Sequence, residues 1–311
     1  MAQDEAGNVI DPFGGQRDLG EKLLRHVSYA FTEDPLRVLR VARFAARYHH
    51  LGFTIAEETM ELLKSIVDQG EMEFLVAERV WKETSRALTE QSPHIYIEVL
   101  RNCGALNVLF PEIDALFGVP QRADYHPEVD TGIHTLMALE QAVKISDSGA
   151  VRFSVLVHDV GKALTPDTVL PSHTGHETSG IPLVQAMCDR LGVPNQYRQL
   201  AMAVTEYHLH SHKAKELKPA TMLKLFQSIG ALRDNNRLKD FLYCCEADAR
   251  GRAGFEEITY QPKKYLTDAL LALQKVDISD LVADGVKGSD IGVQLKQRQI
   301  EQLTIFKSEN L

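Results

Sequence analysis

The stretch Glu33-Asp-Pro-Leu-Arg-Val-Leu-Arg-Val-Ala-Arg-Phe-Ala-Ala-Arg47 combines a helix-start signal with an apolar face and a row of arginines. Asp34 and Pro35 are typical of an N-cap and a first helical residue. At about 100° per residue the arginines fall within roughly a third of the helix circumference, and valine, leucine and alanine take most of the rest. The row consists of Arg37, Arg40, Arg43 and Arg47. Because the glutamates that usually neutralise such a face are missing, we favour a polyanion site over a solvated face.

Helical patterns dominate the chain on both sides of this stretch, and no strand alternation is convincing after residue 20. Apolar periodicity predicts helices over residues 54–67, 77–88, 93–102, 151–160, 176–191, 196–207, 219–229, 236–248, 262–275 and 288–306. The fold class is therefore mostly all-α, with a short β segment near the N-terminus. Pro120 and Pro127 interrupt the pattern and mark a boundary. We divide the chain into residues 1–20, 21–125, 130–232 and 233–311.

The composition is that of a globular protein with a substantial core. The chain has 311 residues, 44% of them apolar, and a formal net charge of −9. An acidic balance is in tension with nucleic-acid binding, although the arginine run is locally basic. Four cysteines show neither zinc nor disulfide spacing, which fits a reducing cytoplasm. No apolar run approaches the length of a membrane span, and no signal peptide is visible.

A second pattern, Val151-Arg-Phe-Ser-Val-Leu-Val-His-Asp-Val-Gly-Lys162, is an apolar helix that ends in polar residues. A buried His158–Asp159 pair is costly unless both side chains are satisfied, and a divalent metal satisfies both. Adjacent helical residues point about 100° apart, so the two can share one ion only at a helix end, for which Gly161 supplies a reason. The candidate ligands are His134, His158, Asp159 and Asp248, which suit Mn, Fe, Co, Ni, Zn or Mg.

This ligand set resembles the HD phosphohydrolase superfamily, whose signature is a histidine, a later His-Asp pair and a distant aspartate. The resemblance implies that His176 and His208 are possible further ligands, as in dinuclear members. We interpret His173, His210 and His212 as exposed loop residues. His158, Asp159 and Lys162 are the expected catalytic residues, with Lys162 binding a phosphate oxygen. Arg250 and Arg252 are weaker candidates for the same contact.

Three further motifs identify a more specific resemblance over essentially the whole chain. They are Asp11-Pro-Phe-Gly-Gly-Gln-Arg-Asp-Leu19, Leu24-Arg-His-Val27 and Glu33-Asp-Pro-Leu-Arg37. Together they resemble the bacterial class II tRNA nucleotidyltransferases, in particular the multifunctional CCA-adding proteins that also carry an HD domain. The resemblance implies that Asp34 and Arg37 pair with the Watson–Crick edge of CTP or ATP. It implies that Arg40 and Arg43 contact phosphate or nucleotide.

The same resemblance implies partners, cofactors and a domain plan. Residues 1–20 correspond to the end of a nucleotidyltransferase head, 21–125 to a tRNA- and nucleotide-binding neck and body, 130–232 to the HD domain and 233–311 to a helical tail. The partners are tRNA, CTP and ATP, in a protein that can form a homodimer. Mg serves nucleotidyl transfer, and Ni or Mn serves the HD site. The implied HD activities are 2′,3′-cyclic phosphodiesterase, 2′-nucleotidase and phosphatase, with a damaged tRNA 3′ end as substrate.

The family's N-terminal head carries a Gly-Gly-x-x-Arg loop and an Asp-x-Asp metal pair, and this sequence contains neither. Nucleotide addition needs metal-bound carboxylates, so we expect that this polypeptide alone does not add nucleotides. Two alternatives stay open: a stand-alone HD nucleotide phosphohydrolase without an RNA role, and a non-catalytic tRNA-binding module.

Overall fold

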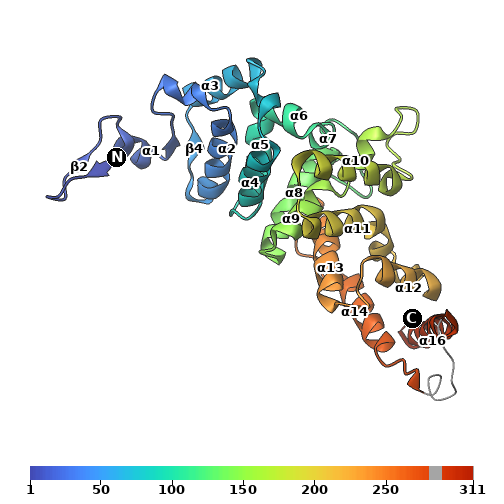
Figure 1. Cartoon of the computed structure of the whole chain (residues 1–311). Coiled ribbons are helices and arrows are strands. Elements are labelled where there is room, and N and C mark those ends of the chain that lie inside the picture. Colours follow the sequence, from blue (N-terminus) through green and yellow to red (C-terminus); the bar gives the residue numbers. More distant parts are fainter. Residues whose placement is uncertain (280–288, 311) are drawn as a thin grey trace.

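The computed structural model describes residues 1–279 and 289–310, and it is almost entirely helical. The elements follow a bent path from a small hairpin at the N-terminus to a long helix at the C-terminus (Figure 1). The prediction of a mostly all-α protein with a short β segment at its start is confirmed. Within the described residues, no helix is both long and apolar enough to cross a bilayer.

The N-terminal region contains four two-residue strands. Strands β1 (Ala2–Gln3) and β2 (Val9–Ile10) pair antiparallel and form the short β segment that we expected, although their pairing was not predicted. Strands β3 (Leu23–Leu24) and β4 (Thr54–Ile55) pair in parallel, and this pair was not predicted. Two residues are too few to produce a visible alternation of polar and apolar side chains. Helix α1 (Gly15–Glu21) and the short 3₁₀ helix η1 (Tyr29–Glu33) complete the region.

The arginine-rich stretch forms helix α2 (Leu36–Tyr48), which begins one residue later than predicted. Asp34 still assists the start of the helix, because its carboxylate accepts a hydrogen bond from the Leu36 amide at 3.1 Å. The apolar back of α2, with Val38, Leu39 and Ala42 fully buried, packs on α4 (Ala77–Leu88) and α5 (Pro93–Asn102). The remaining elements of this half are η2 (His49–Leu51), α3 (Glu57–Asp68), η3 (Glu71–Phe74), α6 (Ala105–Leu109) and α7 (Pro111–Asp114).

The second half of the chain is a succession of longer helices. They are α8 (Thr131–Ile145), α9 (Gly149–Val157), η4 (Val160–Leu164), α10 (His176–Leu191), α11 (Asn195–His212), η5 (Ala214–Glu216), α12 (Pro219–Ser228), α13 (Asn235–Arg250), α14 (Gln261–Leu273) and α16 (Ser289–Asn310). The predicted last helix started at Gly288, which lies outside the described residues, as does Leu311. The helix predicted over residues 196–207 extends to His212.

Two hydrophobic cores meet at α8 and α9. Leu136 and Leu139 of α8 belong to the core shared with α2 and α5, whereas Ala138 and Ala142 belong to the core shared with α13 and α14. Every residue of α9 is buried, including Arg152, whose guanidinium donates to the carbonyl oxygens of Leu88 and Glu90. Helix α13 packs against α8, α9 and α11, although it follows the division that we predict at residue 232. That division stays a prediction.

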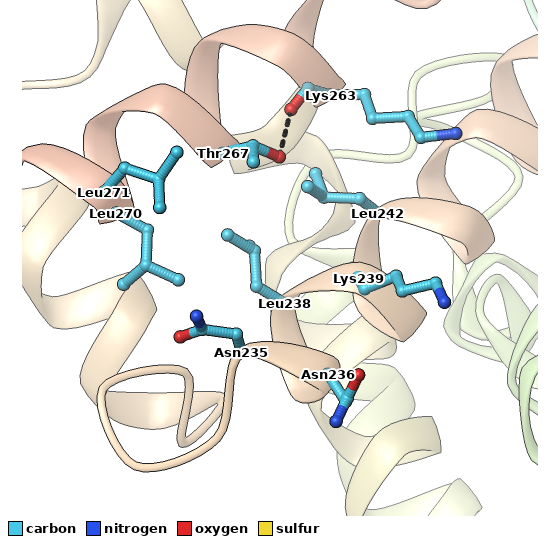
Figure 2. A pocket seen from close by; sticks show the side chains of 9 residues that line it. All are labelled: Asn235, Asn236, Leu238, Lys239, Leu242, Lys263, Thr267, Leu270 and Leu271. Carbon is cyan, nitrogen blue, oxygen red and sulfur yellow. Dashed lines mark hydrogen bonds between the residues drawn. The ribbon is translucent and has the colours of Figure 1, made fainter.

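A small pocket lies between α13 and α14 and has a volume of about 250 Å³. Figure 2 shows leucine side chains at its centre and asparagine and lysine side chains at its edge. The Thr267 hydroxyl donates to the Lys263 carbonyl oxygen at 2.7 Å beside it (Figure 2). The lining contains no carboxylate, imidazole or thiol, so this pocket is not a candidate metal site.

Candidate metal centre and arginine helix

Two helix ends bring the first candidate ligands together. Helix α8 starts with Asp130 as its N-cap, whose carboxylate accepts from the Ile133 amide at 2.9 Å, and this places His134 in the first turn. Helix α9 ends at Val157, with His158 as its C-cap and Asp159 just beyond. The expected helix end at the His-Asp pair is therefore present.

Gly161 has a different role from the one we expected. Its φ angle is not among the positive ones, so it does not act as a left-handed helix cap. Instead, a Cβ atom at this position would lie 2.0 Å from the carbonyl oxygen of His176 and 2.7 Å from the amide nitrogen of Gly180. The missing side chain lets α10 approach η4 and brings His176 next to the His-Asp pair.

One group of buried ligand atoms comes from α8, α9 and α13. Nε2 of His134 lies 3.1 Å from Oδ1 of Asp248, although the two residues are 114 positions apart. Nε2 of His158 lies 3.8 Å from the same oxygen. The side chains of all three residues are at most 6% exposed. The structure thus brings together the histidines and the distant aspartate that the sequence suggested.

A second group surrounds Asp159. Its Oδ2 lies 3.2 Å from Nε2 of His158, and its Oδ1 lies 3.1 Å from Nε2 of His176 and 3.6 Å from Nε2 of His208. The two imidazole nitrogens of His176 and His208 are 3.4 Å apart. All four residues are buried, so these polar atoms have little access to water.

The hydrogen bonds on the far side of the rings define where protons can be. Nδ1 of His176 is 2.7 Å from the carbonyl oxygen of His173, and Nδ1 of His208 is 3.0 Å from that of Val204. A carbonyl oxygen only accepts, so each Nδ1 carries the proton and a neutral ring presents a lone pair at Nε2. Burial lowers the pKa of His208 to about 3, which keeps this ring neutral at physiological pH.

The chemistry of this donor set fits a divalent cation. The lone pairs of His176 and His208 face each other and a carboxylate oxygen of Asp159, an arrangement in which buried acceptors repel unless a cation lies among them. Two ligands bound at about 2.1 Å in a right-angle arrangement are separated by roughly 3.0 Å. The distances of 3.1 to 3.8 Å among the ligand atoms are close to this value. Imidazole with carboxylate suits Zn, Mn, Fe, Co or Ni.

Charge pairing shifts the pKa of the central residues strongly. Burial by itself would lower the pKa of His158, but the negative charges of Asp159 and Asp248 outweigh it and raise that pKa to about 10. Burial would likewise raise the pKa of Asp159 and Asp248, but the neighbouring histidines hold both well below their usual range, with Lys162 also acting on Asp159. The protein without metal therefore holds a proton on His158 at pH 7.

Metal binding is expected to release this proton. Since the raised pKa of His158 lies above 7, its Nε2 must lose a proton before it can bind a metal, and the apparent affinity should rise about tenfold per pH unit from pH 6.5 to 8.5. Calorimetric titration with Mn²⁺ in two buffers of different ionisation enthalpy measures the released proton. An affinity that stays flat across this range would contradict the assignment of His158 as a ligand.

Lys162 is not free in this structure. Its ammonium group lies 2.6 Å from Oδ2 of Asp159 and donates to the side-chain oxygen of Gln121 at 2.6 Å. The lysine is only 6% exposed, so its positive charge interacts with these buried groups and not with solvent. The proposed contact between Lys162 and a phosphate would require it to leave Asp159.

Several residues around the ligands were missed by sequence reasoning. Nε2 of His212 lies 2.6 Å from Oδ2 of Asp248, and the Tyr260 hydroxyl lies 3.0 Å from Nδ1 of the same histidine. The interpretation of His212 as an exposed loop residue is wrong, because it is a partly buried residue of α11. His210 also belongs to α11, and both His210 and His173 are half-buried. The spacing of four between His208 and His212 was a usable signal, since it places both on one helix face.

A second missed group comes from the segment before α8. Oε1 of Glu128 lies 2.9 Å from Nδ1 of His134 and 3.0 Å from Nδ1 of His126. No local pattern indicates these contacts, because they depend on the path of the loop between residues 118 and 130. His126, Glu128 and His134 are close enough to form a further group of possible metal ligands.

The four arginines of α2 do not form one exposed row. Arg40 and Arg47 are exposed, but Arg43 is only 8% exposed, with its Nε 2.8 Å from Oε2 of Glu83. Nη1 of Arg43 also lies 3.4 Å from Oε1 of Glu90. The glutamates that are missing from the arginine stretch itself thus come from α4 and the turn after it.

Asp34 and Arg37, the expected base-reading pair, have separate partners. Oδ2 of Asp34 lies 3.0 Å from Nη2 of Arg79, and Arg37 donates to the carbonyl oxygen of Ala30. Arg37 also lines a cavity of about 830 Å³ between α1, β3, η1 and α2. The cavity wall is mostly apolar and includes Phe31, Phe44 and Tyr48, and the guanidinium of Arg37 lies 5.7 Å from the centre of the Phe31 ring. Asp34, Arg40 and Arg43 are not part of its lining.

Comparisons with known families match both halves of the chain. Residues 52–117 match the family described as a probable RNA- and SrmB-binding site of polymerase A. Residues 131–253 match the HD domain family, a range that includes His134, His158, Asp159 and Asp248. This match extends beyond residue 232 and includes α13.

Similar proteins and structures cover nearly the entire chain. A multifunctional CCA protein of Teredinibacter turnerae is 52% identical over 308 residues, which is 99% of this chain and 75% of that protein. One from Acinetobacter baumannii is 54% identical over 310 residues, which is 100% of this chain and 75% of that protein. A CCA-adding enzyme with CTP has a similar fold, with a TM-score of 0.60 at 20% identity over 96% of this chain and 62% of that one. A Thermotoga maritima CCA-adding enzyme complexed with tRNA has a TM-score of 0.57 at 18% identity over 97% of this chain and 68% of that one.

The curated relatives are longer than this chain, which spans about three quarters of their length. The structural neighbours share the fold at lower sequence identity. Identity above 50% over the whole chain, together with the HD match that contains the buried ligand set, shows that this chain belongs to the family of multifunctional CCA proteins.

Proposed function

We propose that this chain hydrolyses phosphate esters with a divalent metal and that its substrates include 2′,3′-cyclic phosphates at the 3′ end of tRNA. The observation that supports this most directly is the position of Oδ1 of Asp159, which is buried, has no hydrogen-bond donor among the described residues and lies beside the Nε2 atoms of His176 and His208. Trimming a damaged 3′ end before CCA is rebuilt would join this activity to that of the CCA-adding relatives.

The chain's own residues would hold the cation and orient the reaction. His134, His158, Asp159 and Asp248 would bind it, with His176 and His208 completing a second set around Asp159. A bound divalent metal lowers the pKa of water and polarises a phosphoryl oxygen. Carbonyl oxygens hold the Nδ1 protons of His158, His176 and His208 away from the site, so that each Nε2 faces inward.

The direct test is an assay with purified protein. The chain loaded with Ni²⁺ or Mn²⁺ should hydrolyse 2′,3′-cAMP and release phosphate from nucleoside 2′-monophosphates, and chelation should stop both reactions. The absence of turnover with every first-row divalent metal would reject the hydrolase function. It would leave a non-catalytic tRNA-binding module as the remaining interpretation.

The phosphate of the substrate needs a cationic partner, and the three candidates differ in the contacts that they already make. Lys162 is paired with Asp159, and Arg250 lies 3.5 Å from Glu246 and donates to the Ile258 carbonyl oxygen. Among the described residues, Arg252 has no ion-pair partner, and its buried Nε has no acceptor. It follows Asp248 by four residues and directly precedes Ala253, whose amide donates to Glu128. We therefore assign phosphate binding to Arg252.

Replacing Arg252 by alanine should raise the KM for 2′,3′-cAMP about tenfold or more, because a charge-assisted contact to phosphate contributes about 1.5–3 kcal/mol. Arg250→Ala is the matched control, since it removes a guanidinium two residues away that already has partners. Steady-state kinetics with Mn²⁺ at saturation measures both variants. Equal KM values for the two variants would contradict the assignment.

The arginine helix and the cavity beside it support a nucleotide- and tRNA-binding role. We infer that Asp34 and Arg37 read the base of CTP or ATP, that Arg40 contacts phosphate, and that Mg²⁺ serves nucleotide addition. Arg43 takes part in this only if it leaves Glu83. A homodimer and the inactivity of this polypeptide alone in nucleotide addition stay predictions.

Binding of tRNA should weaken steeply as salt rises. If Arg37, Arg40 and Arg47 each neutralise one phosphate, affinity falls roughly 20- to 40-fold between 50 and 200 mM salt. Arg40→Ala with Arg47→Ala should flatten this dependence, and Arg250→Ala should leave it unchanged. Fluorescence anisotropy with labelled tRNA provides the slopes. A slope near zero for the parent protein would favour a stand-alone HD hydrolase.

A further inference from the structure

Glu128 lies directly behind one of the expected metal ligands. Its side chain is 3% exposed, and its Oε1 is 2.9 Å from Nδ1 of His134 and 3.0 Å from Nδ1 of His126. Its other oxygen accepts a hydrogen bond from the Ala253 amide at 3.2 Å. The carboxylate therefore contacts two histidines and the segment that follows α13.

The chemistry of this contact determines the tautomer of His134. An ionised carboxylate only accepts hydrogen bonds, so Glu128 favours the His134 tautomer with its proton on Nδ1, in competition with Asp248, which favours a proton on Nε2. The neutral ring then presents its lone pair at Nε2, which is the nitrogen 3.1 Å from Oδ1 of Asp248. Burial would raise the pKa of Glu128, but its hydrogen bonds with His126 and His134 outweigh this and hold the pKa well below its usual range.

The backbone next to Glu128 provides an independent observation. Val129 has a φ of +61°, which is a strained conformation for a β-branched residue. Such a conformation costs on the order of 1–3 kcal/mol and persists only where surrounding contacts impose it. Here the Val129 carbonyl oxygen accepts from the Gln121 amide at 2.6 Å, and Asp130 caps α8 on the other side. The loop thus keeps a strained residue between the carboxylate and the N-cap.

Glu128 also connects the two ends of the ligand set. His134 lies in the first turn of α8, four residues after the N-cap Asp130, whereas Asp248 lies in the last turn of α13. The Ala253 amide, which Glu128 accepts from, follows Asp248 by five residues. One carboxylate therefore holds the ring of His134 and the chain that leaves Asp248.

We propose that Glu128 is a positioning residue of the metal centre. It holds the His134 ring with Nε2 available to the metal, and it fixes the position of this ring relative to the end of α13. The inference depends on one part of the proposed function, namely that the buried histidines and aspartates bind a divalent cation. Carboxylates behind ligating histidines typically change metal affinity by about 10- to 100-fold when removed.

The test compares three variants by titration with Mn²⁺ alone, monitored by electron paramagnetic resonance. Glu128→Ala should weaken affinity about 10- to 100-fold, and Glu128→Gln, whose amide oxygen can still accept from His134, should weaken it less. Glu140→Gln is the matched control, because Glu140 also lies on α8 and is near a histidine, with its Oε1 3.6 Å from Nε2 of His94. This control should stay within about twofold of the parent.

The tautomer of His134 gives a readout that a purely structural role would not change. Nitrogen NMR of the metal-free protein at pH 8 should show a protonated Nδ1 in the parent, in Glu128→Gln and in Glu140→Gln, and a shift toward a protonated Nε2 in Glu128→Ala. Thermal unfolding without metal checks that each variant is folded. If Glu128→Ala is unfolded, the Mn²⁺ affinity of Glu128→Gln tests the inference instead.

Two results would overturn the inference: a Glu128→Ala variant that binds Mn²⁺ within twofold of the parent, or an unchanged His134 tautomer in that variant. If Glu128→Ala is unfolded, an affinity of Glu128→Gln equal to that of Glu140→Gln overturns it as well. If the parent protein binds neither Mn²⁺ nor any other first-row divalent metal, the proposed function is rejected. The inference about Glu128 is then rejected with it.

Discussion

Replacing His158 by alanine is expected to abolish both metal uptake and phosphodiesterase activity. This histidine belongs to both possible ligand groups that contain a buried aspartate, with its Nε2 3.2 Å from Asp159 and 3.8 Å from Asp248. Its loss leaves two buried carboxylates facing fewer positive charges, so affinity should fall by more than the roughly 10- to 100-fold typical of outer partners. Activity on 2′,3′-cAMP should fall to the level of the metal-free protein.

The matched comparison for this prediction uses two histidines of α11. His208→Ala removes a nitrogen 3.6 Å from Asp159, whereas His210→Ala removes a ring that contacts Tyr207 and has no part in the ligand groups. Metal content after dialysis, measured by elemental analysis, should drop in His158→Ala and His208→Ala and be unchanged in His210→Ala. Full metal content and unchanged turnover in His158→Ala would reject the metal centre.

Replacing Glu83 by alanine is expected to destabilise the arginine helix and its neighbours by about 3 kcal/mol, because it leaves the buried charge of Arg43 with a weaker partner. Glu83 and Arg43 are 7% and 8% exposed, and their closest atoms are 2.8 Å apart. Glu90 at 3.4 Å compensates for part of the loss. Urea unfolding followed by circular dichroism measures the change in the free energy of unfolding.

A double variant separates the ion pair from simple packing. Arg43→Met with Glu83→Met removes both charges and keeps similar volume, so it should recover most of the lost stability. Arg40→Ala removes an exposed arginine from the same helix and should change stability by about 0.5 kcal/mol or less. If Glu83→Ala is as stable as Arg40→Ala, the buried pair does not hold α2 against α4.

Arg40 and Arg43 differ in their surroundings, although both belong to the arginine row of α2. The sequence pattern treats Arg40 and Arg43 alike, as contacts to phosphate or nucleotide. The structure places Arg40 in solvent and Arg43 against two glutamates. We therefore expect Arg40 to affect tRNA binding and Arg43 to affect stability first.

The helices of this chain could be predicted because their signals are local. The apolar period of residues 77–88 and 93–102 and the proline at the start of the second helix are contained in a dozen residues, and both helices have these bounds. The His158–Asp159 pair is equally local, because two adjacent polar residues at the end of a mostly apolar helix need a partner that satisfies both.

The remaining parts of the site depend on contacts between distant positions. Arg43 reaches Glu83 across 40 positions, and His134 reaches Asp248 across 114. Glu128 accepts from Ala253 across 125 positions. Neighbours in sequence carry information about helix faces and ends, but they do not show which helices lie side by side. Local periodicity was therefore enough to indicate a helical protein with a buried His-Asp pair that is a candidate for metal binding. Only the packing of α8, α9, α11 and α13 determines which carboxylates and imidazoles surround that pair. The reason is that buried polar atoms lose their contact with water and must pair with the polar groups that the fold brings next to them.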